Sequence, residues 1–461
     1  MAIATINPAT GLTVREFAPL SDAELDAAIA RAAQAATMYR TTSFADRARW
    51  LNATADLLDA EAEATAALLT LEMGKTLASA KAEVHKCAMA CRYYAEHAEA
   101  MLADEPAQVP GARQAYATYQ PLGVVLAVMP WNFPLWQAVR FIAPALMAGN
   151  AGLLKHASNV PQSALYLADV IARAGFPAGV FQTLLIGSGQ VERVLRDRRV
   201  AAATLTGSEG AGRAVAAIAG QELKKTVLEL GGSDPFLVLP SAGVRAAAEV
   251  ATTARCQNNG QSCIAAKRFI VHAAIYDEFA QAFVERMSAL VVGDPADDKT
   301  DIGPLATEQG RADIEELVDD AVAKGATVLC GGRRVEGPGW FYPPTVITGI
   351  TRDMRLFAEE AFGPVASLYR VESLDEALEI ANATPFGLGS NVWTTDPADV
   401  RRCVAELEAG AVFANGMVTS HPALPFGGVK VSGYGRELSA HGIREFCNIK
   451  SVWIGDAHVS R

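Results

Sequence analysis

GVVLAVM at residues 123–129 and AGLLK at 151–155 begin a series of short apolar runs that alternate with helical stretches. Further runs are FQTLLIG, AAATLTG, TVLEL and FLVL, at residues 181–187, 201–207, 226–230 and 236–239. The segments between them have helical patterns at 162–175, 189–197 and 209–220. Apolar runs of this length that alternate with helices predict a parallel sheet that is buried on both faces.

A second set of strands and helices follows from about residue 236. Its strand-like runs are KRFIVH, ATVLCGG, PTVITGI and GPVASLYRV, at residues 267–272, 326–332, 344–350 and 363–371. NIKSVWIG at 448–455 is also strand-like but comes too late in the chain to belong to this second core. The sequence therefore predicts two α/β domains with a separate strand near the C-terminus.

The N-terminal part has helical patterns instead. Ser21 and Glu24 form a capping box, and Ser43 with the acidic residue three positions later can start a second helix. We expect that second helix to end at Gly74 and a third helix to span residues 77–101.

Composition excludes several classes of protein. The formal net charge of −11 argues against binding to nucleic acid or to an anionic membrane. The seven histidines have no spacing typical of metal ligands, so we expect no metal site. Residues 122–139 lack charge, but two prolines interrupt them, and we interpret them as a strand, a turn and a helix start rather than a membrane span.

Cysteine usage and the N-terminus bear on the cellular compartment. The cysteines are odd in number and form no CxxC pair; they stand at positions 87, 91, 256, 263, 330, 403 and 447. The N-terminus has no basic start followed by an apolar run. Both observations favour a cytoplasmic protein.

The strongest chemical signal is Cys263, in the stretch QNNGQSCIAAKR at 257–268, together with Glu229, in VLELGGSDP at 227–235. A thiol becomes nucleophilic as the thiolate, and a carboxylate with a raised pKa can act as its base or activate water. The alternative is a buried structural cysteine and a glutamate at a helix end.

Two further stretches lie where strands end. Asn132, between the prolines of PWNFP at 130–134, could donate to an oxyanion together with the Cys263 amide, or be an ordinary turn residue. Lys155 and Ser158 follow a strand, where ligands bind in open α/β sheets, although a solvated lysine is equally ordinary.

TLTGSEGAGR carries Gly207 and Gly212 at a strand-to-helix turn. The spacing is GxxxxG rather than GxGxxG, so it favours a tight turn over a phosphate site by itself. Glu360, before a Phe-Gly-Pro turn, could bind a ribose diol or be a surface acid.

Taken together, these motifs resemble the aldehyde dehydrogenase superfamily over nearly the whole chain. The motifs that stand in family order are PWNFP, LLKHAS, TGSEGAG, LELGGSDP, GQSC, EEAFGP, NATPFGLGSNVW and PFGGVKVSGYGRE. The run from residue 425 to 453, with NNGQSCIAAKR, looks most like the NADP-dependent succinate-semialdehyde dehydrogenases of bacteria.

The resemblance implies a fold of two Rossmann-like α/β domains, one for the cofactor and one for catalysis, plus a small β oligomerisation arm. The implied boundaries are 1–102 and 122–230 for the cofactor-binding domain, 231–440 for the catalytic domain, and 103–121 and 441–461 for the arm. A dimer or tetramer is expected, because an isolated late strand leaves an unpaired edge.

The resemblance also implies a mechanism. Cys263 attacks the aldehyde, Asn132 and the Cys263 amide hold the oxyanion, and Glu229 activates the water that hydrolyses the thioester. The residues implied to bind the cofactor are Trp131, Asn132, Lys155, His156, Ala157, Ser158, Gly207, Ser208, Gly212, Leu230, Glu360 and Phe362.

The choice of cofactor follows from position 158. Relatives that select NAD commonly have a glutamate there, which would repel a 2′-phosphate, whereas this chain has Ser158 with Lys155 nearby. We therefore expect NADP to be preferred, with NAD left open as a second cofactor.

The implied substrate is succinate semialdehyde, a small aldehyde that carries a carboxylate. Arg140 matches a carboxylate-binding arginine of the family, although a buried ion pair is the alternative. Gln257 replaces a second arginine found in some relatives, and Ser420 or His421 could compensate for it. Glutarate semialdehyde or a neutral aldehyde therefore stays open, as do transfer of the acyl group to coenzyme A, a simple cysteine hydrolase and a non-catalytic protein.

Overall fold

The computed structural model describes residues 2–456, so the last five residues of the predicted arm lie outside it. Six strands form the first sheet, in the order β17-β9-β8-β5-β6-β7. Their bounds are β5 (Val124–Met129), β6 (Ala151–His156), β7 (Phe181–Thr183), β8 (Val200–Thr206), β9 (Lys225–Glu229) and β17 (Gly433–Tyr434). All neighbours are parallel except β17, which runs antiparallel to β9.

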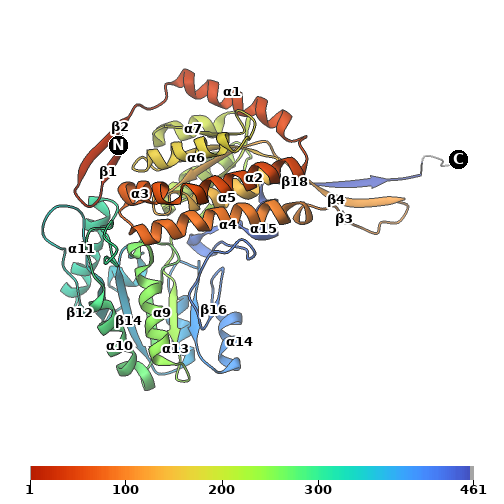
Figure 1. The fold of residues 1–461 in the computed structure, drawn as a ribbon. Helices are drawn as coiled ribbons and strands as arrows, with labels where there is room; N and C mark the ends of the chain where they lie inside the picture. The colour runs from red at the N-terminus through yellow and green to blue at the C-terminus, as the bar shows by residue number, and fades with distance from the viewer. Residues whose placement is uncertain (1, 457–461) are drawn as a thin grey trace.

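Helices cover both faces of this sheet (Figure 1). One face packs against α1 (Asp22–Tyr39), α7 (Ser188–Arg196) and α8 (Glu209–Gln221). The other packs against α2 (Phe44–Ala60), α3 (Ala62–Met73), α4 (Leu77–Met101), α5 (Trp136–Met147) and α6 (Pro161–Arg173). Val124 and Leu126 of β5 belong to the first layer, and Val125 and Ala127 to the second. Burial on both sides explains why this strand is apolar without alternation.

The second sheet has seven strands, in the order β12-β13-β14-β11-β10-β15-β16. They are β10 (Pro235–Val238), β11 (Arg268–His272), β12 (Thr327–Cys330), β13 (Thr345–Thr348), β14 (Val365–Val371), β15 (Asn391–Trp393) and β16 (Phe413–Ala414). One face packs against α9 (Val244–Cys256) and α10 (Tyr276–Ala289). The other packs against α11 (Glu308–Ala323), α12 (Arg355–Ala358), α13 (Leu374–Asn382) and α14 (Pro397–Glu406). The expected fold class, two Rossmann-like α/β units with a small β element, is confirmed.

The small β element projects from the body of the molecule (Figure 1). It consists of β3 (Glu105–Pro106), β4 (Gln114–Pro121) and β18 (Cys447–Ile454), and β18 pairs with β4 along its whole length. The late strand predicted at 448–455 is therefore found. At the other end of the chain, β1 (Ile3–Asn7) and β2 (Leu12–Phe17) form a hairpin.

Two local predictions need correction. The helix expected to run from Ser43 to Gly74 is two helices, because Glu61 leaves helical geometry with φ −104° and ψ 13° and bonds through its carboxylate to Arg173 on α6. Residues 433–434, which the sequence pattern places with the second half, pair with β9 of the first sheet, since the chain crosses back there. The uncharged stretch 122–139 is a strand, a turn and a helix start, as expected.

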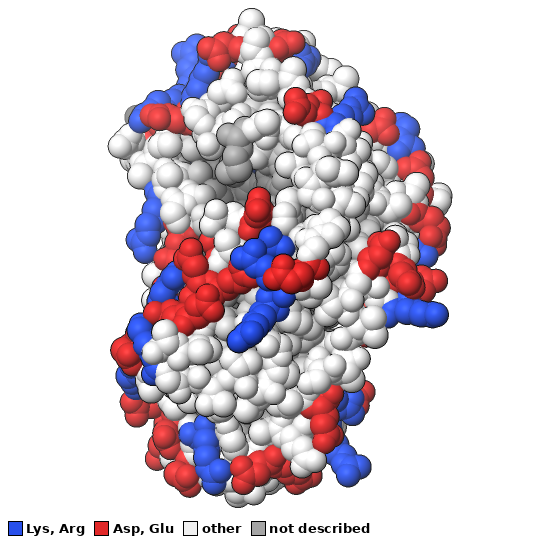
Figure 2. Space-filling model, turned by 90° about the vertical axis from the view of Figure 1, so that its left-hand side faces the viewer, with Lys and Arg blue, Asp and Glu red and all other residues white. Residues whose placement is uncertain are grey.

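The charged surface and the helices give two further observations. Figure 2 shows one face of the molecule, on which basic and acidic side chains are interspersed. Opposite charges also form ion pairs, such as that of Arg355 with Glu359.

Within residues 2–456, each helix is too short or too polar to cross a membrane.

The strand order places the site. β5 lies between β6 and β8. The chain runs from β5 through β6 and β7 on one side of it, and then crosses to β8 and β9 on the other side. In open α/β sheets, ligands bind at such a switch point, outside the carboxyl ends of the strands. The segments that follow β5, β8 and β9 therefore face one crevice.

A buried carboxylate joins three elements of the first half. Glu72 on α3 is fully buried and accepts hydrogen bonds from the Thr5 hydroxyl of β1 (2.6 Å) and from the Gln162 and Ser163 amides of α6 (2.9 Å each). Those amides belong to the first turn of α6 and have no partner within the helix.

We predict that Glu72→Ala lowers the free energy of unfolding by about 2–4 kcal/mol, because several buried donors lose their acceptor. The midpoint of thermal unfolding measures this. Glu63→Ala on the same helix is the control, since Glu63 is exposed and, among residues 2–456, forms an ion pair only with Lys81 at the surface. Equal midpoints for the two variants would contradict the structural role of Glu72.

Candidate active site

The loop after α9 is tied to the first half of the chain. Residues 257–260 form a short turn in which Asn258 and Asn259 have φ values of 55° and 56°. Asparagine tolerates this left-handed conformation better than most residues. The Asn258 side chain donates to the Asn132 carbonyl at 2.8 Å, and Asn259 donates to the carbonyls of Gly74 (2.9 Å) and Pro304 (3.0 Å).

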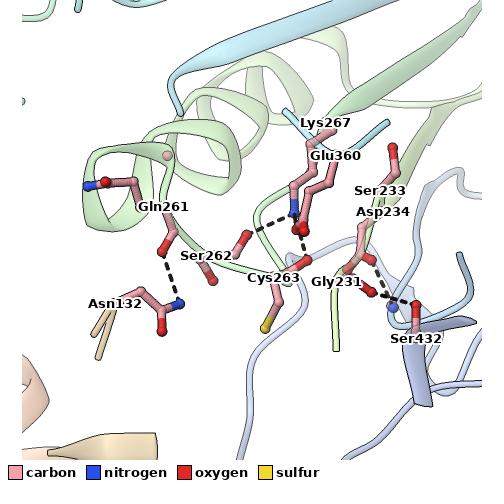
Figure 3. A network of polar contacts seen from close by, with 12 residues as sticks. Asn132, Gly231, Ser233, Asp234, Gln261, Ser262, Cys263, Lys267, Glu360 and Ser432 are labelled. Atoms are coloured by element: carbon pink, nitrogen blue, oxygen red, sulfur yellow. Dashed lines mark hydrogen bonds and ion pairs between the residues drawn. The ribbon is translucent and has the colours of Figure 1, made fainter. Parts of the chain in front are cut away.

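A buried ammonium group fixes the main chain at the cysteine (Figure 3). Lys267 Nζ donates to the carbonyls of Ser262 (2.8 Å) and Cys263 (2.7 Å) and pairs with Glu360 at 3.1 Å. The two carbonyls accept from two of the three N–H groups of the ammonium, and Glu360 supplies the opposite charge. Lys267 therefore joins the loop that carries the thiol to the segment before β14.

Cys263 lies in a cavity of about 280 Å³ between the two sheets. The residues that line it are Pro130, Trp131, Asn132, Gln137, Thr206, Gly207, Ser208, Leu230, Gly231, Cys263, Glu360 and Phe362. Most of them follow the carboxyl ends of β5, β8 and β9, whereas the last three precede β11 and β14. The cavity is thus at the crevice that the strand order indicates.

Asn132 presents its side chain to this cavity. It is 3 % exposed, and its amide nitrogen donates to the Gln261 carbonyl at 3.1 Å (Figure 3). This bond uses one of the two amide hydrogens, so the other remains for a group in the cavity. The position suits the oxyanion donor predicted from the sequence.

The Cys263 thiol is surrounded by protein on most sides. Burial raises its pKa to about 12, and the positive charges of Arg140 and Lys267 oppose this increase. The thiol is therefore protonated near neutral pH, and its proton has to leave when the sulfur reacts.

Glu229 lies just behind the cavity wall. It is 1 % exposed, and burial together with Glu437 raises its pKa to about 8, against the influence of Arg140. A side chain at Gly427 would come within 2.7 Å of Glu229 Oε1, so glycine leaves room for the carboxylate there. In this conformation Leu230 and Gly231, but not Glu229, line the cavity.

The opposite wall has the predicted nucleotide-facing residues. The rings of Trp131 and Phe362 lie perpendicular, with centroids 5.7 Å apart. Ser208 caps α8, with Gly207 just before it, so the first amides of that helix point toward the crevice. Glu360 approaches closely because position 231 is glycine, where a Cβ would meet Glu360 Oε2 at 2.6 Å.

Three of the residues predicted to bind the cofactor make close contacts within the protein. His156 is buried; its Nε2 donates to the Pro134 carbonyl at 2.7 Å and its Nδ1 accepts from the Ala157 amide. Ala157 itself packs in an apolar cluster. A Cβ at Gly212 would meet Leu230 Cδ2 at 2.6 Å, so this glycine allows helix and strand to pack. These contacts help to shape the site, and the assignment of the three residues to the cofactor stays a prediction.

Lys155 and Ser158 lie at the end of β6, outside the lining of the cavity. Both are partly buried, and burial lowers the pKa of Lys155. Within residues 2–456, Lys155 pairs with no carboxylate. A basic and a hydroxyl side chain are therefore available beside the switch point.

Three of the residues predicted to bind the substrate are Arg140, Ser420 and His421. Arg140 is 2 % exposed, pairs with Glu437 at 2.7 Å and stacks on Phe426. Ser420 and His421 lie near α4, since Ser420 accepts from Lys86 and His421 packs edge-on against Tyr93.

Gln257 lies elsewhere. It lines a different cavity, with residues of α9 and residues 301–302, and its amide bonds back to the Ala254 carbonyl. The loop turns after it, so Gln257 does not come together with the other predicted substrate residues.

Several residues at the site were not predicted from the sequence. They are Lys86, Trp136, Gln137, Thr206 and Lys267. Lys267 could have been noticed, since a lysine in AAKR close to the cysteine precedes a buried strand. Lys86 gives no such signal, because it looks like any polar residue on a long amphipathic helix.

A partly buried thiol between two doubly wound sheets, beside an amide donor and a carboxyl group with a raised pKa, defines an α/β enzyme that works through a cysteine. Residues 1–452 match the profile of the aldehyde dehydrogenase family. The chain belongs to this family.

Curated relatives cover nearly the whole chain. A Mycobacterium tuberculosis protein named succinate-semialdehyde dehydrogenase (NADP(+)) 1 is 70% identical over 456 residues, which are 98% of this chain and 100% of that protein. A Mycobacterium avium protein named succinate-semialdehyde dehydrogenase (NADP(+)) is 69% identical and covers 99% of this chain and 98% of its own length.

Solved structures have the same fold. Succinic semialdehyde dehydrogenase from Streptococcus pyogenes, in complex with NADP+, superposes with a TM-score of 0.96 at 38% identity and covers 98% of this chain and 100% of that one. An NADP-dependent enzyme of E. coli superposes with a TM-score of 0.95 at 37% identity, covering 99% and 95%.

Proposed function

We propose that this protein oxidises succinate semialdehyde to succinate with NADP as the electron acceptor. The observation that carries the proposal is one cavity in which Cys263 meets Asn132, Glu360 and Phe362, with the charge of Arg140 close enough to act on the thiol. The relatives at about 70% identity bear the name of this activity.

The walls of the crevice fit NADP. Asn132 Oδ1 and Thr206 Oγ1 are buried on the cavity wall without a hydrogen-bond partner among the described residues. We assign Trp131, Leu230 and Phe362 to the nicotinamide ring, Glu360 to its ribose, Gly207 and Ser208 to the phosphates, and Lys155 and Ser158 to the 2′-phosphate. When bound, NADP accepts the hydride that the captured aldehyde releases.

Side chains and one main-chain amide of the protein capture the aldehyde. The Cys263 sulfur forms a bond to the aldehyde carbon, and the thiol proton passes to a base, for which Glu229 is our candidate. The negative oxygen of the thiohemiacetal accepts from the free amide hydrogen of Asn132 and from the Cys263 main-chain amide. Loss of hydride leaves a thioester on Cys263.

Once Glu229 has released the thiol proton to solvent, it activates water. A carboxyl group with a pKa of about 8 is partly ionised near neutral pH, so it can take a proton from water and release it again. Because its side chain lies behind the wall, the carboxylate has to turn toward Cys263 for this step. The space at Gly427 allows a resting position away from the thiol.

The carboxylate of the substrate needs donors beyond Cys263. We assign Arg140 and Ser420 to this subsite, with His421 at its outer edge. Arg140 is also the buried partner of Glu437, so both of the alternatives considered for it apply. Glutarate semialdehyde, with one more methylene, is the competing substrate.

We further infer which residues bind the cofactor, which carry the nucleophile and which join subunits. Residues 1–102 and 122–230 bind the cofactor, most of 231–440 carries the nucleophile, and the arm at 103–121 and 441–456 joins subunits. The seven cysteines are all free thiols, which supports a reducing compartment such as the cytoplasm.

The central experiment compares NADPH formation by the wild type, Cys263→Ala and Glu229→Gln with succinate semialdehyde and NADP. We expect steady turnover by the wild type and none by Cys263→Ala. Glu229→Gln should release a single equivalent of NADPH and then turn over about 10²- to 10⁴-fold more slowly, because the thioester persists.

Other outcomes would redirect the proposal. Unchanged steady turnover in Glu229→Gln would remove Glu229 as the base. A wild type that accumulates a product only when coenzyme A is added would indicate acyl transfer instead of hydrolysis. Failure with every aldehyde would favour a non-catalytic protein.

The cofactor assignment predicts the behaviour of position 158. Ser158→Glu places a carboxylate beside the 2′-phosphate, so kcat/KM with NADP should fall by about 100-fold while kcat/KM with NAD changes little. Ser158→Ala is the control for loss of the hydroxyl alone. A parallel decrease with both cofactors would mean that residue 158 does not face the 2′-phosphate.

The assembly predicts a measurable mass. β18 is the edge of its sheet and exposes Ile449 (61 %) and Trp453 (58 %), which pairing with another subunit would cover. Light scattering should therefore give a dimer or tetramer, and Ile449→Lys should shift it toward smaller species. A monomeric wild type would contradict the assignment of the arm.

A further inference from the structure

Lys86 is a largely buried cation without a neutralising acid. It lies on α4, which packs against α5, with its ammonium 4.4 Å from the centre of the Trp136 ring. Burial, followed by the charge of Arg140, lowers its pKa to about 8. Within the described chain, no carboxylate forms an ion pair with it. A buried ammonium in this state is costly and favours an anion from outside the chain.

Lys86 shares a hydroxyl with Trp136. Ser420 is 5 % exposed, and its Oγ accepts from Lys86 Nζ at 3.0 Å and from Trp136 Nε1 at 2.9 Å. A hydroxyl oxygen has two acceptor positions, and these two bonds use both. The O–H of Ser420 is thus left to donate, and among residues 2–456 no acceptor bonds to it.

This cluster is continuous with the thiol along α5. Arg140 is one helical turn after Trp136, so the two side chains share a face of α5. Arg140 is near enough to both Cys263 and Lys86 to shift the pKa values of both. Gln137, between them, lines the cavity that holds Cys263. Lys86 is therefore the next cation outward from the nucleophile.

Arg140 and Lys86 differ in how far their charges are compensated by a carboxylate. Arg140 already has a carboxylate partner, Glu437, and both members of the pair are buried, so Glu437 offsets the charge of Arg140 at least in part. The charge of Lys86 has no such compensation. An incoming carboxylate is therefore attracted mainly by Lys86, while Arg140 offers N–H groups that its ion pair leaves free.

We propose that Lys86 and the Ser420 hydroxyl bind the remote carboxylate of the aldehyde substrate and so determine its selection over uncharged aldehydes. The inference rests on the proposed function and deepens it, because Lys86 comes from α4, which carries none of the residues predicted from the sequence.

The test measures kcat and KM for succinate semialdehyde and for butanal, which has the same chain length without the carboxylate. Lys86→Met removes the charge and the donor, Lys86→Gln keeps a donor toward Ser420 without the charge, and Lys86→Arg keeps the charge. Lys81→Met is the matched control, since Lys81 is on the same helix and pairs with Glu63 at the surface.

We expect both Lys86→Met and Lys86→Gln to raise KM for succinate semialdehyde about 10- to 100-fold, with kcat little changed and kinetics with butanal unaffected. Lys86→Arg should recover part of the loss, and Lys81→Met should behave as the wild type. This separation of KM from kcat, confined to the charged substrate, is not expected from a merely structural lysine.

Three results would contradict the inference, and one of them would also contradict the proposed function. If the wild type prefers succinate semialdehyde and both neutral variants keep that preference, the inference fails alone. Wild-type preference retained only by Lys86→Gln would reduce Lys86 to a support for Ser420 and overturn its role as the carboxylate's counter-charge. A wild type that oxidises butanal as efficiently as succinate semialdehyde overturns the proposed function together with the inference.

Discussion

The ammonium group of Lys267 is the interaction on which the active-site architecture depends. Loops that enter the second sheet bring main-chain carbonyls into a buried region, and such groups need donors. Lys267 gives two N–H groups to the carbonyls of Ser262 and Cys263 and its charge to Glu360. One buried cation thus fixes both the nucleophile loop and the acid that faces the cofactor side, and removal of any partner would leave it uncompensated.

The two sheets meet end to end around this group. The first sheet contributes residues after the carboxyl ends of its strands, and the second contributes residues before the amino ends of its own. Burial between them raises the pKa of Cys263 and of Glu229 alike. Near neutral pH the thiol is therefore protonated and Glu229 mostly so, which limits uncompensated negative charge in the crevice until a substrate arrives.

Local chemistry in the sequence was sufficient for much of this site and failed where partners are distant. Prolines beside Asn132 and glycines near Cys263 indicate tight turns, and the unbroken apolar strands indicate burial on both faces. Lys86 was missed because its partner Ser420 is 334 positions away in the chain. His156 could not be given a role from the sequence, because a histidine at a strand end looks the same whether it faces a ligand or supports the neighbouring turn through a bond such as that to the Pro134 carbonyl.

The return of the chain to the first sheet has a consequence for biosynthesis. The Ser432 hydroxyl bonds to the Gly231 carbonyl at 2.7 Å, β17 extends the first sheet, and Glu437 neutralises Arg140. All three contributions come from residues 432–437, which follow Cys263 by well over a hundred positions in the sequence. A ribosome-bound chain that has already exposed Cys263 therefore lacks part of the scaffold around it, and the reactive thiol acquires these surroundings only after residues 432–437 have been synthesised.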